Sequence, residues 1–106
     1  MNLKGSLPLL ILHTLADSPK HGYRIAKDIK SQSQGVLDFK EGTLYPTLHS
    51  LEKQGLIKAY TEIENGRERR YYRLTDSGRE AFNHELNEWE RYSNAVRMVL
   101  KGAASQ

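Results

Sequence analysis

The chain of 106 residues contains no cysteine, which excludes disulfide bonds and thiolate chemistry and is compatible with a reducing cytoplasm. It also lacks a long apolar run. The apolar stretch 7–12 is interrupted by His13, is far too short to span a bilayer, and is followed by no signal-peptide cleavage pattern. The four histidines show no metal-ligand spacing, and no glycine-rich phosphate loop is present. We therefore expect a cytoplasmic protein that needs no membrane, metal or cofactor and is not an enzyme.

Composition and length are those of one folded domain. Hydrophobic residues make up 38% of the chain and charged residues 27%, which argues against disorder. The formal net charge is +3, and it is unevenly distributed. Residues 1–73 carry 12 Lys and Arg against 8 Asp and Glu, whereas residues 74–106 carry 4 against 5. The basic excess therefore lies in the first part of the chain.

The stretch 41–56 predicts the helix around which the chain is organised. Spacings of four and three residues place three leucines on one face: Leu44, Leu48 and Leu51. Gly55 stands where a helix C-terminus favours a left-handed residue. Pro46 lacks a backbone N–H and is expected in the first turn, so the helix should begin at residue 41 or 42.

The other face of this helix has almost no charge but carries hydroxyls, a ring nitrogen and bare backbone. Its residues are Gly42, Thr43, Tyr45, Pro46, His49 and Ser50. Small hydrogen-bonding groups near a helix N-terminus suit the major groove of DNA. The alternative is an ordinary core helix with a weakly polar outer surface.

Two further helices are expected before residue 41. Ser6 should cap the first, with Pro8 in its first turn, and residues 17–19 should end it. This helix is apolar almost all round, so it is either central to the core or shared with another subunit. The second spans 21–30, and residues 36–39 form a small strand or an extended link. Three helices in this order make a helix-turn-helix pattern.

A β-hairpin should follow. Residues 56–63 suit a strand, 64–66 contain the Asn-Gly signal of a tight turn, and 67–74 return. Strand alternation places four side chains on one face: Arg67, Arg69, Tyr71 and Arg73. Arginine forks bind phosphate well, so a hairpin in this position is expected to be a wing beside the DNA groove. An ordinary charged hairpin is the alternative.

The last helix should run from about residue 76 to 101, a length of about 39 Å. Its apolar residues fall close to a heptad seam: Phe82, Leu86, Trp89, Val96 and Leu100. A helix this long exceeds what so small a domain can cover, so we expect it to pack against a second subunit rather than across its own domain. The expected fold is mainly α with a small β-hairpin: a winged helix-turn-helix (1–74), a C-terminal dimerisation helix (75–102) and a flexible tail (103–106).

Nearly the whole chain resembles the PadR-like family of bacterial transcriptional regulators, specifically its small members with one C-terminal helix. The resemblance rests on these motifs: His21-Gly22-Tyr23, Gly42-Thr43-Leu44-Tyr45-Pro46, Leu51-Glu52-Lys53-Gln54-Gly55-Leu56-Ile57, and Gly66-Arg67 leading to Arg70-Tyr71-Tyr72-Arg73-Leu74-Thr75 with Gly78 after it. It implies a homodimer that binds double-stranded operator DNA, usually as a repressor. It also implies that the N-terminal helix joins the last helix in the dimer, which adds Leu9 and Leu12 to the interface. Some small members bind flat aromatic compounds at that interface, against a tryptophan in the position of Trp89.

The expected DNA contacts divide into two kinds. Those at or near base edges are Gly42, Thr43, Tyr45, Pro46 and His49, where Gly42 allows close backbone approach and the hydroxyls of Thr43 and Tyr45 reach bases or phosphates. Those that hold phosphates are Tyr23, Lys27, Lys40, Arg67 and Arg69. A two-fold dimer would place its two recognition helices about 34 Å apart on a palindromic operator. The competing hypothesis is a winged helix that binds another protein without touching DNA.

Overall fold

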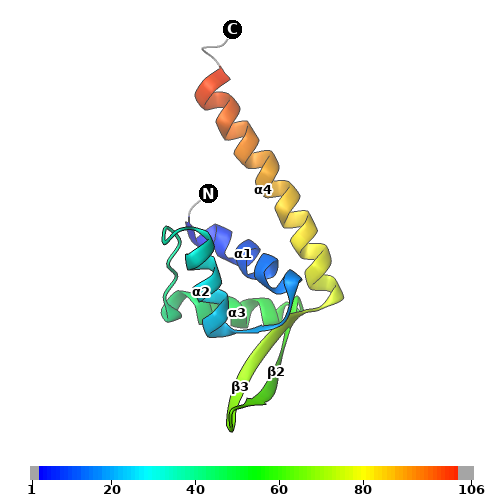
Figure 1. Ribbon diagram of the computed structural model, residues 1–106. Coiled ribbons are helices and arrows are strands. Elements are labelled where there is room, and N and C mark those ends of the chain that lie inside the picture. Colours follow the sequence, from blue (N-terminus) through cyan, green and yellow to red (C-terminus); the bar gives the residue numbers. More distant parts are fainter. Residues whose placement is uncertain (1–2, 103–106) are drawn as a thin grey trace.

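The computed structural model describes residues 3–102. Its elements are α1 (Leu3–Asp17), β1 (Lys20–His21), α2 (Gly22–Gln32), α3 (Glu41–Lys53), β2 (Ile57–Glu64), β3 (Arg67–Leu74) and α4 (Asp76–Gly102) (Figure 1). The three strands form one antiparallel sheet in the order β1-β3-β2. The expected class, mainly helical with a winged hairpin and a long last helix, is confirmed. The tail expected over 103–106 lies outside the described residues.

Helix α1 lies at the centre of the core. Its buried residues are Leu7, Ile11, Leu12 and Leu15, which pack against leucines and isoleucines of α2 and α3 and against the base of the sheet. This central position explains why the helix is apolar on nearly every side. The expected start at Ser6 is wrong, because α1 already begins at Leu3 and Pro8 is its sixth residue.

The short strand β1 was not predicted. Lys20 pairs with Tyr72 and His21 with Tyr71 of β3, so the segment before α2 joins the sheet. A strand of two residues is too short to show an alternating pattern in the sequence. His21 then becomes the N-cap of α2, because its Nδ1 accepts a hydrogen bond from the backbone N–H of Arg24 at 3.3 Å.

Helix α3 begins and ends as expected. It buries Leu44, Leu48 and Leu51, and Gly55 adopts the left-handed conformation (φ 78°) that turns the chain into β2. Residues 37–40 form an extended link rather than a strand. Pro46, expected in the first turn, is instead the sixth helical residue.

The hairpin is anchored at its base and exposed at its tip. Asn65 and Gly66 both have positive φ (52° and 77°), as the Asn-Gly signal predicts, and Glu64 pairs with Arg67. At the base, Ile57, Tyr72 and Leu74 are buried in the core. The hairpin therefore extends from the body as a rigidly rooted wing (Figure 1).

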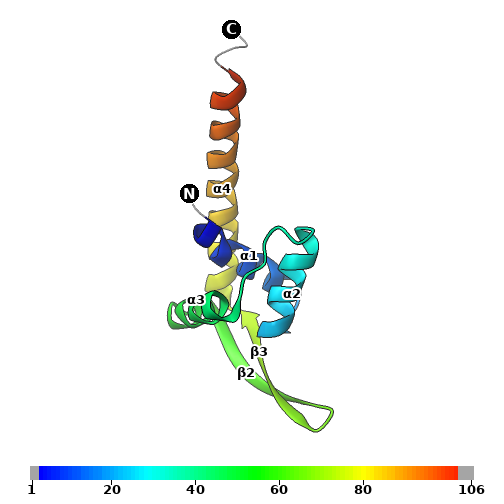
Figure 2. The same cartoon turned by 90° about the vertical axis from the view of Figure 1, so that its left-hand side faces the viewer.

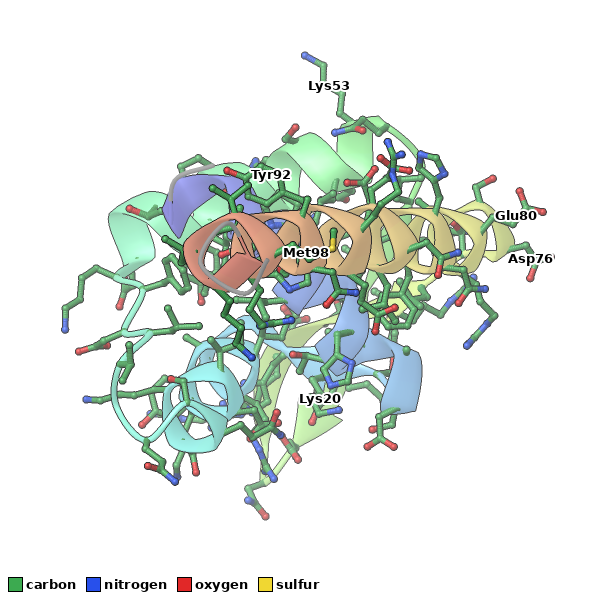
Figure 3. The ribbon with its side chains drawn as sticks, turned by 90° about the horizontal axis from the view of Figure 1, so that it is seen from above. Lys20, Lys53, Asp76, Glu80, Tyr92 and Met98 are labelled. Atoms are coloured by element: carbon green, nitrogen blue, oxygen red, sulfur yellow. The ribbon has the colours of Figure 1, made fainter. Side chains whose placement is uncertain are left out.

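Helix α4 starts on the domain and then leaves it. Phe82 packs against the core, with its ring centroid 5.8 Å from that of His13 on α1. Beyond this point the helix projects past the other elements, which gives the protein a longest extent of 63 Å against 29 and 22 Å (Figure 2). Viewed from above, the side chains of Asp76 and Glu80 point outward where α4 begins (Figure 3). The projecting half carries exposed apolar side chains: Tyr92, Val96, Met98, Val99 and Leu100.

Candidate nucleic-acid interface

The outer face of α3 carries no charged side chain over residues 42–50, as expected from the sequence, and the exposed charges of the helix, Glu41 and Lys53, lie at its two ends. Gly42, Pro46 and His49 are exposed, and Thr43 is half-buried. Pro46 has no N–H to donate to the Gly42 carbonyl four residues earlier, and a Cβ at Gly42 would meet no atom within 4 Å. The first turns of α3 therefore present accessible backbone and small polar groups, the combination that a base edge can approach closely.

Tyr45 is placed differently from its neighbours on this helix. Its ring lies against the first residue of α2, where a Cβ built on Gly22 would be 2.8 Å from the Tyr45 hydroxyl oxygen. The side chain is half-buried and packs against the core. Burial raises the pKa of the Tyr45 hydroxyl, and the neighbouring Tyr72 and Glu41 raise it further. The structure thus places the ring between two helices, although the sequence suggested that its hydroxyl would reach DNA.

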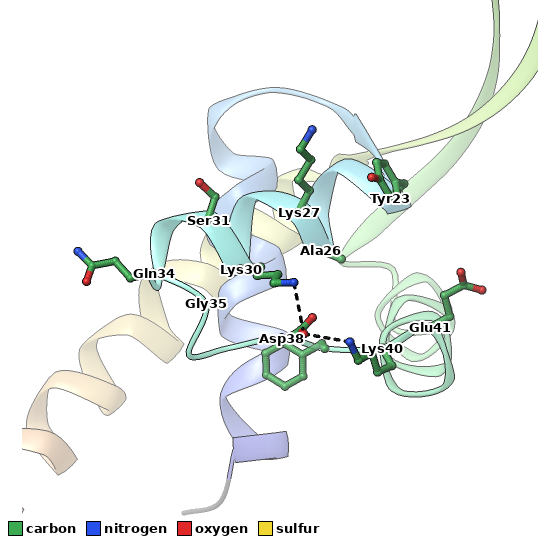
Figure 4. Close-up of a pocket in the computed structure, with 11 residues that line it drawn as sticks. Tyr23, Ala26, Lys27, Lys30, Ser31, Gln34, Gly35, Asp38, Lys40 and Glu41 are labelled. Atoms are coloured by element: carbon green, nitrogen blue, oxygen red, sulfur yellow. Dashed lines mark hydrogen bonds and ion pairs between the residues drawn. The ribbon is translucent and has the colours of Figure 1, made fainter.

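A groove of about 660 Å³ separates α2 from the start of α3, and it is lined by three lysines: Lys27, Lys30 and Lys40. Two of the expected phosphate-binding residues project from α2 along this groove: Tyr23, which is 66% exposed, and Lys27 (Figure 4). The carboxylate of Asp38 lies between the other two lysines, 2.9 Å from Lys40 Nζ and 3.5 Å from Lys30 Nζ. The hydrogen bond from Lys40, with the charge of Lys30, lowers the pKa of Asp38.

Lys30 was absent from the expected site. Nothing local in the sequence shows that the link after α2 folds back beside this residue. The structure brings it next to Lys40 through their shared partner Asp38.

The wing carries its arginines on two faces. Arg67 is exposed beside the turn, and Arg69 Nε lies 3.3 Å from Glu64 Oε1. Arg70 points the other way, toward α3, where one of its terminal nitrogens lies 3.1 Å from Glu52 Oε2. Strand alternation correctly separated Arg70 from Arg67 and Arg69, but it could not show that the Arg70 side chain reaches Glu52 of α3.

The residues expected at the dimer interface fall into two groups. Leu12 is 1% exposed and Phe82 packs on its own core, so contacts within one protomer already cover the Leu12 side chain and part of Phe82; Leu9 stays partly accessible. The rest lie along α4, where Leu86 and Trp89 are half-buried, Val96 is 39% exposed and Leu100 is 80% exposed. Trp89, Val96 and Leu100 border a shallow hollow of about 270 Å³ on the projecting half of the helix.

Residues 3–102 contain neither a metal site nor a membrane-spanning helix. No group of three or more histidine, aspartate or glutamate side chains could hold a metal ion there. Within the same range, no helix is both long and apolar enough to cross a membrane.

The sequence matches the family described as "Transcriptional regulator PadR-like family" over residues 11–84. It is also 36% identical to the transcriptional regulator Rv3488 of Mycobacterium tuberculosis over 93 residues, which cover 88% of this chain and 84% of that protein. The transcriptional regulator YqjI of Escherichia coli is 32% identical over 100 residues, 94% of this chain but 47% of that longer protein.

Solved structures agree with the sequence comparisons. A transcriptional regulator from Clostridium thermocellum superposes with a TM-score of 0.86 at 32% identity, over 93% of this chain and 97% of that one. Bacillus subtilis PadR, solved in complex with operator DNA, superposes with a TM-score of 0.68 at 31% identity, over 76% of this chain and 46% of that one. Three of these relatives are named as transcriptional regulators, and the two solved structures share the fold described above over the residues that superpose.

Proposed function

The chain belongs to the PadR-like family of transcriptional regulators, and we propose that it is a repressor that binds a palindromic operator as a homodimer. The observation that carries the proposal is the division of one surface into two chemistries. The outer face of α3 over residues 42–50 carries no charged side chain, while cations flank it on α2, on the link before α3 and on the wing. A DNA duplex needs both, since phosphate contacts position a protein and base-edge contacts specify the sequence.

The proposed roles follow from where each side chain lies. On α3, Gly42, Thr43, Pro46 and His49 approach base edges. The phosphates are held by Tyr23 and Lys27 of α2, Lys40 of the link, and Arg67 and Arg69 of the wing. That the relative from Bacillus subtilis was solved with operator DNA supports DNA as the partner of this fold.

The projecting half of α4 supports the homodimer. Its apolar side chains, among them Val99 at 75% and Leu100 at 80% exposed, find no cover within the described part of one protomer. Residues 75–102 would then hold two DNA-binding domains, each formed by residues 1–74, at the separation that successive major grooves require.

The first test is binding to the DNA upstream of the protein's own gene and to random DNA of equal length, each at two salt concentrations. A specific complex with a steep salt dependence and a two-fold symmetric footprint is the expected result. Binding to neither DNA at low salt would refute the proposal and favour the competing hypothesis, a winged helix that binds another protein. Higher expression of a reporter gene under the operator when the gene for the protein is deleted would show a repressor, and lower expression would show an activator.

The dimer has its own test. Val96→Glu buries a charge if this face meets a second copy, so the protein should sediment as a monomer and lose the symmetric footprint. Asn94→Glu, on another side of the same helix, is the matched control and should remain dimeric. An unchanged mass for Val96→Glu would exclude this interface.

We also propose a flat aromatic effector that binds between the two protomers beside Trp89. The support is the family resemblance and the hollow that Trp89 borders on α4, where its ring centroid lies 6.4 Å from that of Tyr92. Trp89 is the only tryptophan, so its fluorescence reports directly on binding. A panel of planar aromatic and phenolic compounds should contain one that quenches this emission and weakens operator binding. Failure of every compound to quench would remove the effector from the proposal.

A further inference from the structure

We propose that the contact between Gly22 of α2 and Tyr45 of α3 sets the distance between the phosphate-holding helix and the base-reading helix. Tyr45 is then a positioning residue and not a base contact, and Gly22 is the residue that makes room for it. The inference rests on the DNA-binding function proposed above and names a part of its specificity.

The close approach of the two residues is the first observation. A Cβ at Gly22 would lie 2.8 Å from Tyr45 Oη, 2.9 Å from Cε1 and 3.1 Å from Cζ. Real Cβ atoms are essentially never found within 3.0 Å of a heavy atom from a residue that is not adjacent in the chain, so an alanine here would force the ring or the helix to move. Gly22 does not have a positive φ, so backbone conformation does not require a glycine at this position. A glycine is needed at position 22 because its missing Cβ leaves space for the Tyr45 ring.

The surroundings of Tyr45 limit how far its ring can turn away from a Cβ at position 22. It is half-buried and packs against the core, unlike the exposed Pro46 that follows it. Burial raises the pKa of the hydroxyl, and Tyr72 of β3 is among its close neighbours. A ring held between α2 and the core transmits any change at Gly22 to the position of α3, because packed interiors have little free volume.

The two helices that meet here carry different contacts. Tyr23 follows Gly22 directly, and Lys27 lies five residues after Gly22 on the same helix. A shift of the start of α2 therefore moves both proposed phosphate contacts. Thr43 and Pro46 flank Tyr45 closely on α3, among the proposed base contacts. Binding to random DNA depends on charge and tolerates a small shift between the helices, whereas hydrogen bonds to base edges do not. A change at this contact should therefore reduce sequence preference more than overall affinity for DNA.

The experiment uses a duplex selected by the wild-type protein from a randomised library and a scrambled duplex of equal composition. Gly22→Ala should lose on the order of tenfold in affinity for the selected duplex, the equivalent of about 1.4 kcal/mol, and less than about twofold for the scrambled one. Tyr45→Phe keeps the ring and should bind both duplexes within about twofold of wild type. Gly102→Ala, where a Cβ meets nothing within 4 Å, is the matched control and should change neither affinity.

A double-mutant cycle assigns the effect to this pair. In the Tyr45→Ala background, where the ring is gone, Gly22→Ala should cause no further loss of preference. Three results would overturn the proposal: equal losses on both duplexes from Gly22→Ala, no loss at all, or a lost preference in Tyr45→Phe, which would make the hydroxyl a base contact.

Failure of the proposed DNA-binding function can be told apart from failure of the helix contact. If the wild-type protein binds no DNA, the regulator proposal fails, and the helix contact is tested by the same cycle on unfolding in denaturant. Coupling between the two positions would then establish the contact without a role in DNA binding, and the positioning role would be refuted together with the function.

Discussion

Gly78, in the first turn of α4, lies at the junction where the recognition helix, the wing and the last helix meet. A Cβ on this residue would overlap the backbone carbonyl oxygen of Leu56 and come within 2.9 Å of its carbon and 3.1 Å of Leu74 Cδ2. The same Leu56 oxygen accepts hydrogen bonds from the backbone N–H and the hydroxyl of Thr75, each at 3.1 Å. Gly78→Ala must therefore displace backbone, which cannot rotate away as the end of a side chain can.

The magnitude follows from what the displacement breaks. Overpacking a tight site costs about 1–3 kcal/mol, and loosening the two hydrogen bonds to Leu56 costs about 1 kcal/mol each. Alanine regains about 1 kcal/mol through its higher helix propensity. We expect Gly78→Ala to lower the free energy of unfolding by about 3 kcal/mol, which for a domain of this size lowers the Tm by about 12–24 °C.

Thermal unfolding followed by circular dichroism, at one fixed protein concentration, measures this shift, because the Tm of a dimer depends on concentration. Gly102→Ala on the same helix has open space and should leave the Tm within a few degrees of wild type. A Gly78→Ala protein that melts with wild type would refute the reasoning, since the tight junction at Leu56 would then have to yield without cost.

Two further predictions concern the DNA interface, and a third concerns the N-cap of α2. Gly42→Ala should raise the free energy of unfolding by up to about 1 kcal/mol, because its Cβ meets open space, yet weaken DNA binding; a tight-binding variant would show that the backbone of α3 stays away from DNA. Arg67→Ala should weaken binding to every duplex and reduce the slope of log affinity against log salt by about one unit, and an unchanged slope would remove this arginine from the phosphate contacts. Burial and the charge of Arg69 lower the pKa of His21, whose Nδ1 accepts a hydrogen bond from the backbone N–H of Arg24. The contribution of neutral His21 to the stability of the fold is therefore complete above about pH 6.5, and it is lost as the pH falls through the lowered pKa. In denaturant unfolding from pH 7.5 to 5, His21→Asn should keep the cap and flatten this dependence; an unchanged profile would show that His21 is not its source.

The sequence predicted the elements whose signals are local. The leucines of α3, the Gly55 stop and the Asn65-Gly66 turn each depend on a few adjacent residues, and the structure has them at the expected positions. The order of elements was enough to predict the class of fold. The local signal of proline was misleading in both cases. Pro8 and Pro46 were both assigned to first turns, yet each is the sixth residue of its helix.

Other features depend on contacts between distant parts of the chain, and no local pattern contains them. The position of Tyr45 is one: its spacing on α3 fits the outer face, and only the approach of Gly22, 23 residues earlier, turns the ring inward. The pairing of Arg70 with Glu52 is another, since it depends on the angle at which the wing leaves the body. Leu12 is a third, because burial within the protomer and burial at a dimer interface demand the same apolar residue.

The charges around α3 argue that recognition depends on its uncharged face more than the number of cations suggests. Several cations of this surface already have a carboxylate within 3.5 Å: Lys40 with Asp38, Lys30 with Asp38, Arg69 with Glu64 and Arg70 with Glu52. A phosphate that approaches any of these cations must compete with the carboxylate, and it also brings two negative charges close together. Each such cation should therefore contribute less to DNA affinity, and less to its salt dependence, than an unpaired cation would. If the protein binds DNA as proposed, its affinity for random DNA should be lower than the number of cations suggests, and the proposed base contacts of Gly42, Thr43, Pro46 and His49 should decide which sequence it prefers. Asp38→Asn, which frees two lysines at once, should steepen the salt dependence and strengthen binding to the scrambled and the selected duplex by about the same factor. A gain on only one of the two duplexes would show that these lysines do not act as sequence-independent phosphate contacts.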